Sequence, residues 1–431
     1  MALTGRLGLV ALAAAAVVGL LAPTGWGVVV ATALLLALVA LDVALAGSVR
    51  GLSMARDGDS VVRLGETATV CLTVTNPSSR RVRGRLRDAW PPSAEAREQR
   101  HPLDIPPGER RRVVTTLRPT RRGDRVAHRV TVRAVGPLGL AARQGSHVVP
   151  WRLRALPPFT SRKHLPSRLA RLRELDGRSA VMVRGQGTEF DSLREYVLGD
   201  DVRSIDWRAS ARASDVMVRT WRPERDRQVL LVLDCGRTAA GRVGDAPRLD
   251  AAMDAALLLA ALAARAGDRV DLLVYDRSVR ARVQSVTGDG LLPALVQAMA
   301  PIDASLVEPD YRGMVATVLA RASRRSLVVL LTALDTAPVE EGLLPVLAQL
   351  TRRHRVVLAS VADPRVEEMA SARGDADAVY DAAAAERSRS DRRRLAELLG
   401  RRGVEVVDAP PHLLAPDLAD RYLALKAAGR L

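Results

Sequence analysis

One segment of this 431-residue chain concentrates the residue types that could do acid–base or metal chemistry. Residues 184–212 carry six carboxylates and five arginines, interleaved with apolar residues at helical spacing. Because arginine pairs bidentately with carboxylates, near-equal numbers of the two favour a folded ion-pair network. Alternatively, the carboxylates form a metal or acid–base site, although arginines at this density would neutralise it. The candidate interaction or structural residues are Glu189, Phe190, Arg194, Glu195, Tyr196, Gly199, Asp200, Asp201, Arg203, Asp206, Trp207 and Arg212.

Other catalytic signatures are absent from the sequence. The chain contains only two lysines, Lys163 and Lys426, and no GxxxxGK[ST] motif, so it is not itself a P-loop ATPase. Its six histidines are scattered singly, without an HExxH motif, and it has no GxSxG elbow. Two cysteines, Cys71 and Cys235, leave no disulfide framework and no cysteine metal knuckle. Nothing in the sequence therefore argues for an enzyme.

The C-terminal region, residues 226–431, alternates strand and helix patterns. Short, continuously apolar runs are typical of strands that are buried on both faces. Strands are expected at residues 229–233, 270–275, 327–331, 356–361 and 404–407. Helices are expected at 249–266, 311–324, 340–353 and 413–427. This alternation predicts a parallel, doubly wound α/β sheet with helices on both faces.

The preceding region, residues 47–155, is rich in strand patterns instead. Apolar and polar residues alternate in runs such as 67–75 and 127–135, and proline, glycine and asparagine turns separate the runs. Short strands at this spacing predict a small antiparallel β-sandwich of immunoglobulin-like type. Residues 156–225 are expected to be a linker with a short helix, followed by the segment rich in charged residues.

Residues 1–46 contain two long uncharged stretches, 7–22 and 26–46, interrupted only by a proline–glycine turn and by Asp42. A membrane-spanning helix needs about 17–25 residues, so the first stretch is marginal and the second adequate. We expect a transmembrane helical hairpin. The alternative is a signal peptide cleaved near the small residues 44–46, but the apolar region is longer than a signal sequence and is broken by the turn.

The charge distribution bears on the membrane. Of the net charge of +17, residues 47–165 supply +15, with 24 basic and 9 acidic residues. Few aromatic residues accompany them, which argues against nucleic-acid binding. We expect this region to contact an anionic membrane surface; the alternative is that arginines merely decorate a solvated sheet. Arg6, Arg50 and Arg56 flank the hairpin, so the positive-inside rule places both termini in the cytoplasm, at the plasma membrane.

The segment 184–212 closely resembles the signature of the domain of unknown function 58 family. The order of membrane helices, β-rich domain and α/β domain is also similar to that family. The resemblance implies a C-terminal von Willebrand factor A-like domain and a MoxR-type AAA+ ATPase as partner. The residues that carry it are Gly187, Thr188, Glu189, Phe190, Leu193, Arg194, Glu195, Tyr196, Gly199, Asp200, Asp201, Arg203, Ile205, Asp206, Trp207, Ala209, Ser210, Ala211 and Arg212.

Many A domains bind Mg²⁺ through Asp-x-Ser-x-Ser, a later threonine and a later aspartate. In this chain Asp234 and Thr238 match the first motif, but Gly236 stands where the first serine belongs. Pro309 occupies the neighbourhood of the threonine, and Ala333 stands where the later aspartate is expected. Because Mg²⁺ demands a nearly complete ligand set, we expect no bound cofactor, with Mg²⁺ as the alternative. Asp234 would then only cap the end of its strand.

These observations together favour a membrane-anchored, non-enzymatic adaptor or assembly protein. It would dock a cytoplasmic MoxR-type AAA+ ATPase, or the client of that ATPase, through the A-like domain. The alternative is a carboxylate-based hydrolase that uses Glu189, Asp200 and Asp206 of the signature segment.

Overall fold

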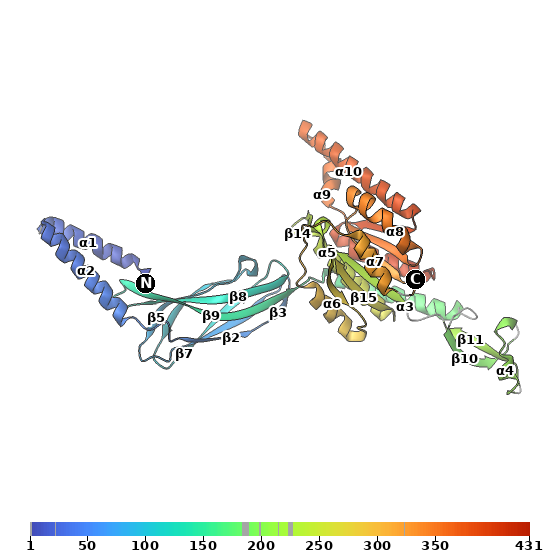
Figure 1. The fold of residues 1–431 in the computed structure, drawn as a ribbon, viewed down its shortest axis with the longest axis horizontal. Helices are drawn as coiled ribbons and strands as arrows, with labels where there is room; N and C mark the ends of the chain where they lie inside the picture. The colour runs from blue at the N-terminus through green and yellow to red at the C-terminus, as the bar shows by residue number, and fades with distance from the viewer. Residues whose placement is uncertain are drawn as a thin grey trace. The chain divides into compact units, whose positions relative to one another are not determined.

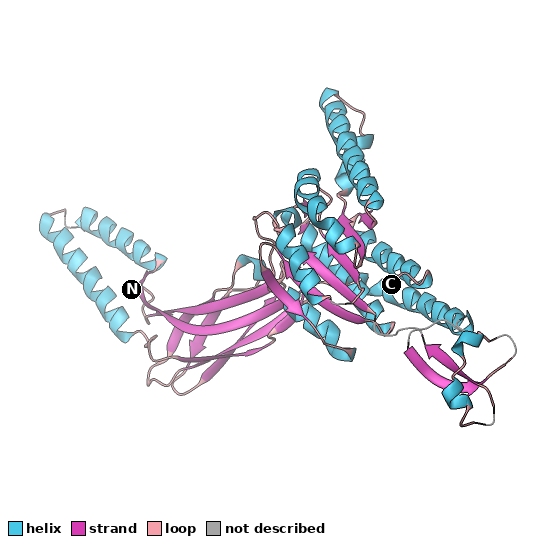
Figure 2. Ribbon diagram, turned by 45° about the vertical axis from the view of Figure 1, so that its right-hand side comes forward, coloured by secondary structure: helices cyan, strands magenta, loops and turns pink. Residues whose placement is uncertain are grey.

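The chain forms two compact units, Met1–Leu156 and Pro157–Leu431 (Figure 1). The first contains two helices and a set of long strands, and the second contains a sheet flanked by helices (Figure 2). The computed structural model describes residues 2–21, 23–182, 189–197, 200–213, 215–222, 227–322 and 324–431.

The N-terminal residues form the expected helical hairpin. Helix α1 spans Gly5–Leu21 and helix α2 spans Gly25–Leu45, with Pro23 in the turn between them. Among the described helices, α2, with 21 residues, is the one long and apolar enough to cross a membrane. Helix α1 is also apolar but has only 17 residues. Just before α1, the hydroxyl of Thr4 donates a hydrogen bond of 3.0 Å to the carbonyl oxygen of Leu140.

Asp42 joins the C-terminal end of α2 to the neighbouring β-rich domain. Its side chain is completely buried. One carboxylate oxygen accepts a hydrogen bond of 2.7 Å from the amide of Leu138, and the other accepts two of 2.8 Å from the amides of Leu140 and Ala141. At Gly136, a Cβ atom would lie 2.2 Å from a carboxylate oxygen, so only glycine fits there. An apolar helix accommodates this carboxylate because backbone donors replace water.

The β-rich domain is the expected two-sheet sandwich, and the hydrophobic core between the sheets takes residues from both. The smaller sheet is antiparallel, with the order β2-β4-β7, and contains Ser53–Gly58, Ala68–Thr75 and Arg110–Leu117. The larger sheet has the order β1-β9-β8-β5-β6, and β3 pairs with β9 in parallel, an exception to the predicted antiparallel arrangement. Its strands are β1 (Ala2–Leu3), β3 (Val61–Arg63), β5 (Val82–Asp88), β6 (Arg100–Ile105), β8 (Gly123–Val135) and β9 (Ala141–Leu156).

A buried ion pair lies inside the sandwich. Arg56 of β2 contacts Asp88 of β5, and each side chain is only 1% exposed. Asp88 also accepts hydrogen bonds from Trp90 Nε1 at 3.0 Å and from Thr115 Oγ1 of β7 at 3.3 Å. Burial lowers the pKa of Arg56, against the opposing effect of Asp88. Counting Arg56 among the charges that flank the membrane was therefore wrong, because it bridges the two sheets.

The C-terminal region forms the expected doubly wound α/β sheet, with the order β16-β15-β12-β17-β18-β19. All strands are parallel except β16, an antiparallel edge strand. Helices α5 and α11 pack together, and α7 and α8 pack together against the opposite side of the sheet. The strands are β12 (Gln228–Asp234), β15 (Arg269–Tyr275), β16 (Val279–Val283), β17 (Leu327–Leu331), β18 (Arg355–Val361) and β19 (Val404–Ala409). The helices named are α5 (Arg248–Arg265), α7 (Tyr311–Arg321), α8 (Leu344–Thr351) and α11 (Pro411–Ala427).

Several elements differ from the sequence-based expectation. The region predicted as a linker with a short helix contains a 3₁₀ helix at Thr160–His164 and helix α3, Leu165–Met182, which at 18 residues is longer than expected. Helix α3 contacts α5 and α11, and two of its arginines pair with Asp420 at 2.9 Å. The sequence patterns also did not reveal β16, α6 (Leu291–Met299), α9 (Pro364–Ser371) and α10 (Ala376–Arg401).

Replacing Asp42 tests the connection between the helix and the sandwich. In Asp42→Asn the amide keeps one acceptor oxygen and turns an NH₂ group toward an N–H donor, so we expect a loss of about 2–4 kcal/mol in the free energy of unfolding. Urea unfolding of the full chain in a mild detergent measures this. The matched control is Asp57→Asn, because Asp57 pairs with Arg112 on the surface, where both side chains are more than half exposed. Equal stability of the two variants would contradict the role of Asp42.

Candidate functional site

The signature segment forms a β-hairpin with helical turns in its connection. Strand β10 (Glu189–Glu195) pairs with β11 (Met217–Arg222) in antiparallel register, with an irregularity after Phe190. The helical spacing assigned to its apolar residues was therefore wrong for β10. The side chains of Glu189 and Phe190, and the whole of Gly199, lie outside the described part of the chain.

Asp206 organises the connection between the two strands. Its Oδ1 accepts hydrogen bonds of 3.0 Å from the amides of Arg208 and Ala209, which caps helix α4 (Trp207–Ser210). Its other oxygen accepts a bond of 2.8 Å from Arg219 of β11. The amide of Ala209, followed by the Arg219 guanidinium, holds the pKa of this carboxyl below its usual range. Asp206 is therefore ionised and accepts three hydrogen bonds, whereas a general acid must be protonated.

A second ion pair stabilises the other end of the hairpin. Asp200 accepts hydrogen bonds of 2.6 Å from Arg194 and 3.0 Å from the amide of Val197. The pairing raises the pKa of Arg194. The structure also pairs Asp206 with Arg219, which lies outside residues 184–212 and was not identified from the sequence.

The remaining predicted residues are mostly on the surface. Asp201 caps a short 3₁₀ helix by accepting a hydrogen bond of 3.0 Å from the amide of Arg203. The amide of Tyr196 donates to the carbonyl of Val216, and its side chain is half-buried. Glu195, Arg203 and Arg212 are exposed.

The apolar residues of this hairpin are largely exposed. Trp207 is 68% exposed, and Val202 and Val197 are 62% and 60% exposed. Among the described apolar side chains of the segment, Val218 is buried, at 4% exposed. Hydrogen bonds and ion pairs therefore hold the hairpin, while Trp207, Val202 and Val197 face outward.

A different site lies at the carboxyl end of β12, where the strand order of the sheet reverses. Ligands of open α/β sheets bind at such a point. Asp234 is buried there and accepts hydrogen bonds from the amide of Gly236 at 2.8 Å and the hydroxyls of Thr238 and Thr332 at 3.1 and 2.6 Å. Burial is the main cause that raises the pKa of Asp234. Asp234 caps the end of β12, as the sequence led us to expect.

The residues around Asp234 explain why the metal motif is incomplete. A Cβ atom at position 236 would lie 2.8 Å from the ring of Pro309, so a serine does not fit beside that proline. Gly236 and Pro309 therefore depend on each other. The adjoining cavity has a volume of about 10 Å³, roughly one water. In the described part of the chain, no three His, Cys, Asp or Glu side chains cluster as metal ligands would.

Neighbouring Cys235 does not act as a nucleophile here. Its side chain is fully buried, and burial raises the pKa of the thiol to about 12. A thiol with this pKa is protonated at neutral pH, whereas nucleophilic cysteines need a lowered value.

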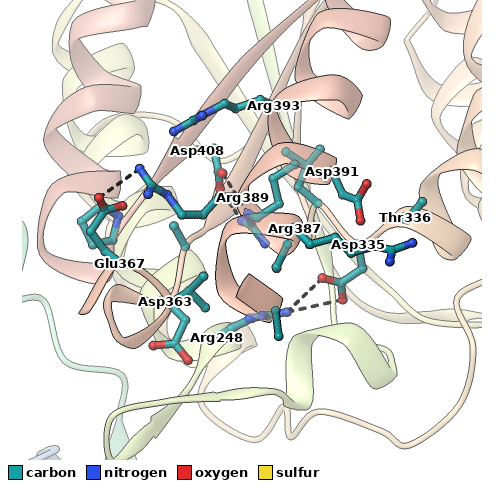
Figure 3. A pocket seen from close by; sticks show the side chains of 17 residues that line it. Arg248, Asp335, Thr336, Asp363, Glu367, Arg387, Arg389, Asp391, Arg393 and Asp408 are labelled. Carbon is teal, nitrogen blue, oxygen red and sulfur yellow. Dashed lines mark hydrogen bonds and ion pairs between the residues drawn. The ribbon is translucent and has the colours of Figure 1, made fainter. Parts of the chain in front are cut away.

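A pocket in the second unit lies near the carboxyl ends of β17, β18 and β19, with a volume of about 720 Å³ (Figure 3). Five arginines and five carboxylates line it. Arg248 pairs with Asp335 at 3.4 Å, and Arg389 of α10 pairs with Glu367 of α9 at 3.0 Å. Opposite charges thus balance in this pocket, so its charge favours neither anions nor cations. The sequence did not predict this pocket, because helices α9 and α10, which line part of it, were not predicted.

The raised pKa of Asp234 gives a pH-dependent prediction. The pKa of Asp234 is higher in the folded protein than in the unfolded chain, where it is about 4. The stability that protonated Asp234 contributes is therefore fully present below the unfolded pKa and is lost as the pH rises through the folded pKa. Asp234→Asn removes this titration. We therefore expect the free energy of unfolding of Asp234→Asn, minus that of the unchanged protein, to be larger at pH 8 than at pH 4, because only the unchanged protein loses stability as Asp234 ionises. Urea unfolding at both pH values measures it, and a constant difference would refute it.

Magnesium gives a separate test of the same site. Because two threonine hydroxyls and one amide already occupy the Asp234 carboxylate, millimolar MgCl₂ should leave the thermal unfolding temperature of the full chain unchanged. A rise in that temperature that disappears in Asp234→Asn would show that a metal binds there.

Comparison with known proteins finds relatives without an assigned function. Residues 192–396 match the family described as "Protein of unknown function DUF58". "Uncharacterized protein Rv1480" of Mycobacterium tuberculosis and "Uncharacterized protein Mb1516" of Mycobacterium bovis are each 26% identical over 197 residues, 45% of this chain. The match spans 61% of the length of these relatives.

Among solved structures, the CARDB domain of the PF1109 protein from Pyrococcus furiosus is 15% identical, covers 24% of this chain and 86% of that domain, and has a TM-score of 0.18. The PapD-like domain 7 of human CEP192 is also 15% identical, covers 24% of this chain and 84% of that domain, and has a TM-score of 0.19. Similarities this slight carry no argument about the fold. Residues 192–396 are similar to the DUF58 family, and the relatives that match this chain are uncharacterised proteins.

Proposed function

We propose that this protein is a membrane-anchored, non-enzymatic docking protein that presents its signature hairpin to a cytoplasmic partner. The observation that carries the proposal is the set of exposed apolar side chains on one short hairpin. Five such residues on a hairpin, one of them tryptophan, are typical of a protein interface. They are Leu193 (38% exposed), Val197 (60%), Val202 (62%), Trp207 (68%) and Val216 (40%).

The ion pairs of the hairpin support this proposal. A docking surface binds more tightly when it is held in its bound shape beforehand. Arg194 with Asp200, and Arg219 with Asp206, hold the strands and their connection without covering the apolar side chains. The same pairs occupy two of the three carboxylates that a hydrolase would need, so the geometry favours docking over hydrolysis.

The proposed partner is a MoxR-type AAA+ ATPase or its client, as the family resemblance implies. The α/β domain would contribute to the docking surface. Its strand order, with β12 in the middle and the antiparallel strand β16 at one edge, supports the proposed von Willebrand factor A-like fold. Helices α1 and α2 would together hold the protein in the plasma membrane as a hairpin, with both termini in the cytoplasm.

A pull-down tests the partner. The tagged full-length protein is extracted from its own host in mild detergent, with and without ATP, and bound proteins are identified by mass spectrometry. We expect an AAA+ ATPase whose recovery changes with the nucleotide. Its absence under both conditions would contradict the proposal.

Variants then locate the docking surface. Trp207→Ala removes an exposed aromatic side chain, so the free energy of unfolding should hardly change while recovery of the ATPase falls about tenfold or more. The matched control is Tyr380→Ala, because Tyr380 of α10 is 77% exposed and lies outside the hairpin. Equal recovery with both variants would show that the hairpin is not the docking surface.

A further inference from the structure

A basic groove lies where the helical hairpin meets the β-sandwich. Its volume is about 1430 Å³, and it contains six arginines but only one carboxylate, Asp104. Much of the remaining lining is glycine, including Gly47, Gly84 and Gly136, which leaves room between the guanidinium groups. The arginines are Arg6, Arg80, Arg81, Arg83, Arg85 and Arg133.

Two of these arginines face each other across neighbouring strands. Arg85 of β5 is the direct partner of Arg133 of β8 in the antiparallel register, and both side chains are exposed. Like charges directly opposite each other destabilise a sheet. At Gly84, a Cβ atom would lie 2.0 Å from the carbonyl oxygen of Arg133, so this glycine allows the two strands to approach closely.

The groove does not neutralise its own charge. Asp104 is already engaged by Arg81, with hydrogen bonds of 2.6 and 2.9 Å. Arg133 donates to the neutral side-chain oxygen of Gln144, at 3.2 and 3.0 Å. Within the described part of the chain, no ion pair involves Arg85 or Arg133. An anion between these two guanidinium groups would relieve their repulsion and accept several charge-assisted hydrogen bonds.

The position of the groove identifies the source of that anion. Leu45, the last residue of α2, and Arg6, in the first turn of α1, both line it. Arg80 donates a hydrogen bond of 2.6 Å to the carbonyl of Ala44 at the same end of α2. If α2 spans the bilayer, its terminus lies at the depth of the lipid headgroups, where basic pockets beside helices bind anionic lipids.

We propose that this groove binds the phosphate of an anionic phospholipid headgroup between Arg85 and Arg133. The proposal rests on the membrane anchoring stated under the proposed function, and it assigns the contact with the membrane surface to one site. The lipid would hold the β-sandwich against the cytoplasmic leaflet, next to its own anchor.

Thermal unfolding of the full-length protein in a mild non-ionic detergent tests the groove. The added probes are dioleoylphosphatidylglycerol, dioleoylphosphatidylcholine or inorganic phosphate. We expect phosphatidylglycerol to raise the unfolding temperature by several degrees, and the other two probes to leave it unchanged. Equal stabilisation by phosphatidylcholine would overturn the proposal, and an equal effect of inorganic phosphate would overturn the assignment to a lipid.

Paired variants locate the effect in the groove. R85Q/R133Q should lose the shift with phosphatidylglycerol, and without lipid it should unfold at or above the temperature of the unchanged protein, since the repulsion is gone. The control R97Q/R121Q removes the same charge from exposed positions; Arg121 precedes β8, on the order of 35 Å along that strand from Arg133. Retention of the shift in R85Q/R133Q would overturn the proposal.

Two further measurements cover the case in which the double variant does not fold and distinguish the groove from the membrane anchor. If R85Q/R133Q does not fold, native mass spectrometry of the unchanged protein replaces it: preferential retention of phosphatidylglycerol supports the groove, and equal retention of both lipids overturns it.

Carbonate extraction of host membranes distinguishes a failure of the lipid-binding groove from a failure of the membrane anchor. A chain that stays in the membrane without any lipid preference contradicts only the groove, whereas a chain found in the soluble fraction contradicts the anchor.

Discussion

The hydrogen bonds of Asp42 are the interaction on which the N-terminal part of the structure depends. A carboxylate at the end of an apolar helix is costly unless donors replace its water, and three backbone amides of the loop at 138–141 do so. The bonds fix the end of α2 against the sandwich instead of leaving a flexible tether. The basic groove exists only because this end of the helix and the outer strands are held side by side. The proposed lipid contact is thus a consequence of one buried aspartate.

Buried aspartates join elements elsewhere in the chain as well. Asp88 connects the two sheets of the sandwich. Asp254 of α5 accepts hydrogen bonds from Thr160 and Ser161, which holds the segment before α3. Asp268 binds Tyr422 and Lys426 of α11. In each case the carboxylate is engaged in holding the fold together. These aspartates are therefore structural.

The sequence predicted the elements that have a strong hydrophobic pattern and missed those that have none. The central strands are continuous apolar runs, and Leu327–Leu331 was predicted to the residue. Helix α10 has 26 residues but buries only four of its side chains, so its sequence carries little apolar periodicity and the pocket beside it could not be expected. In the signature segment, charge counting predicted ion pairs, and the described residues include the pair of Arg194 with Asp200. It could not identify Arg219 as the partner of Asp206, because that pairing depends on strand register, nor show that Trp207 faces outward.

We propose that the exposed hairpin docks a cytoplasmic AAA+ ATPase. The most direct test places a photo-crosslinking amino acid at position 207 of the full-length protein in its own host, with the same amino acid at position 380 as the reference. Irradiation followed by mass spectrometry identifies what lies against each position. The account predicts an AAA+ ATPase crosslinked from position 207 and not from position 380. Crosslinks from position 207 only to this chain itself or to lipids would contradict it.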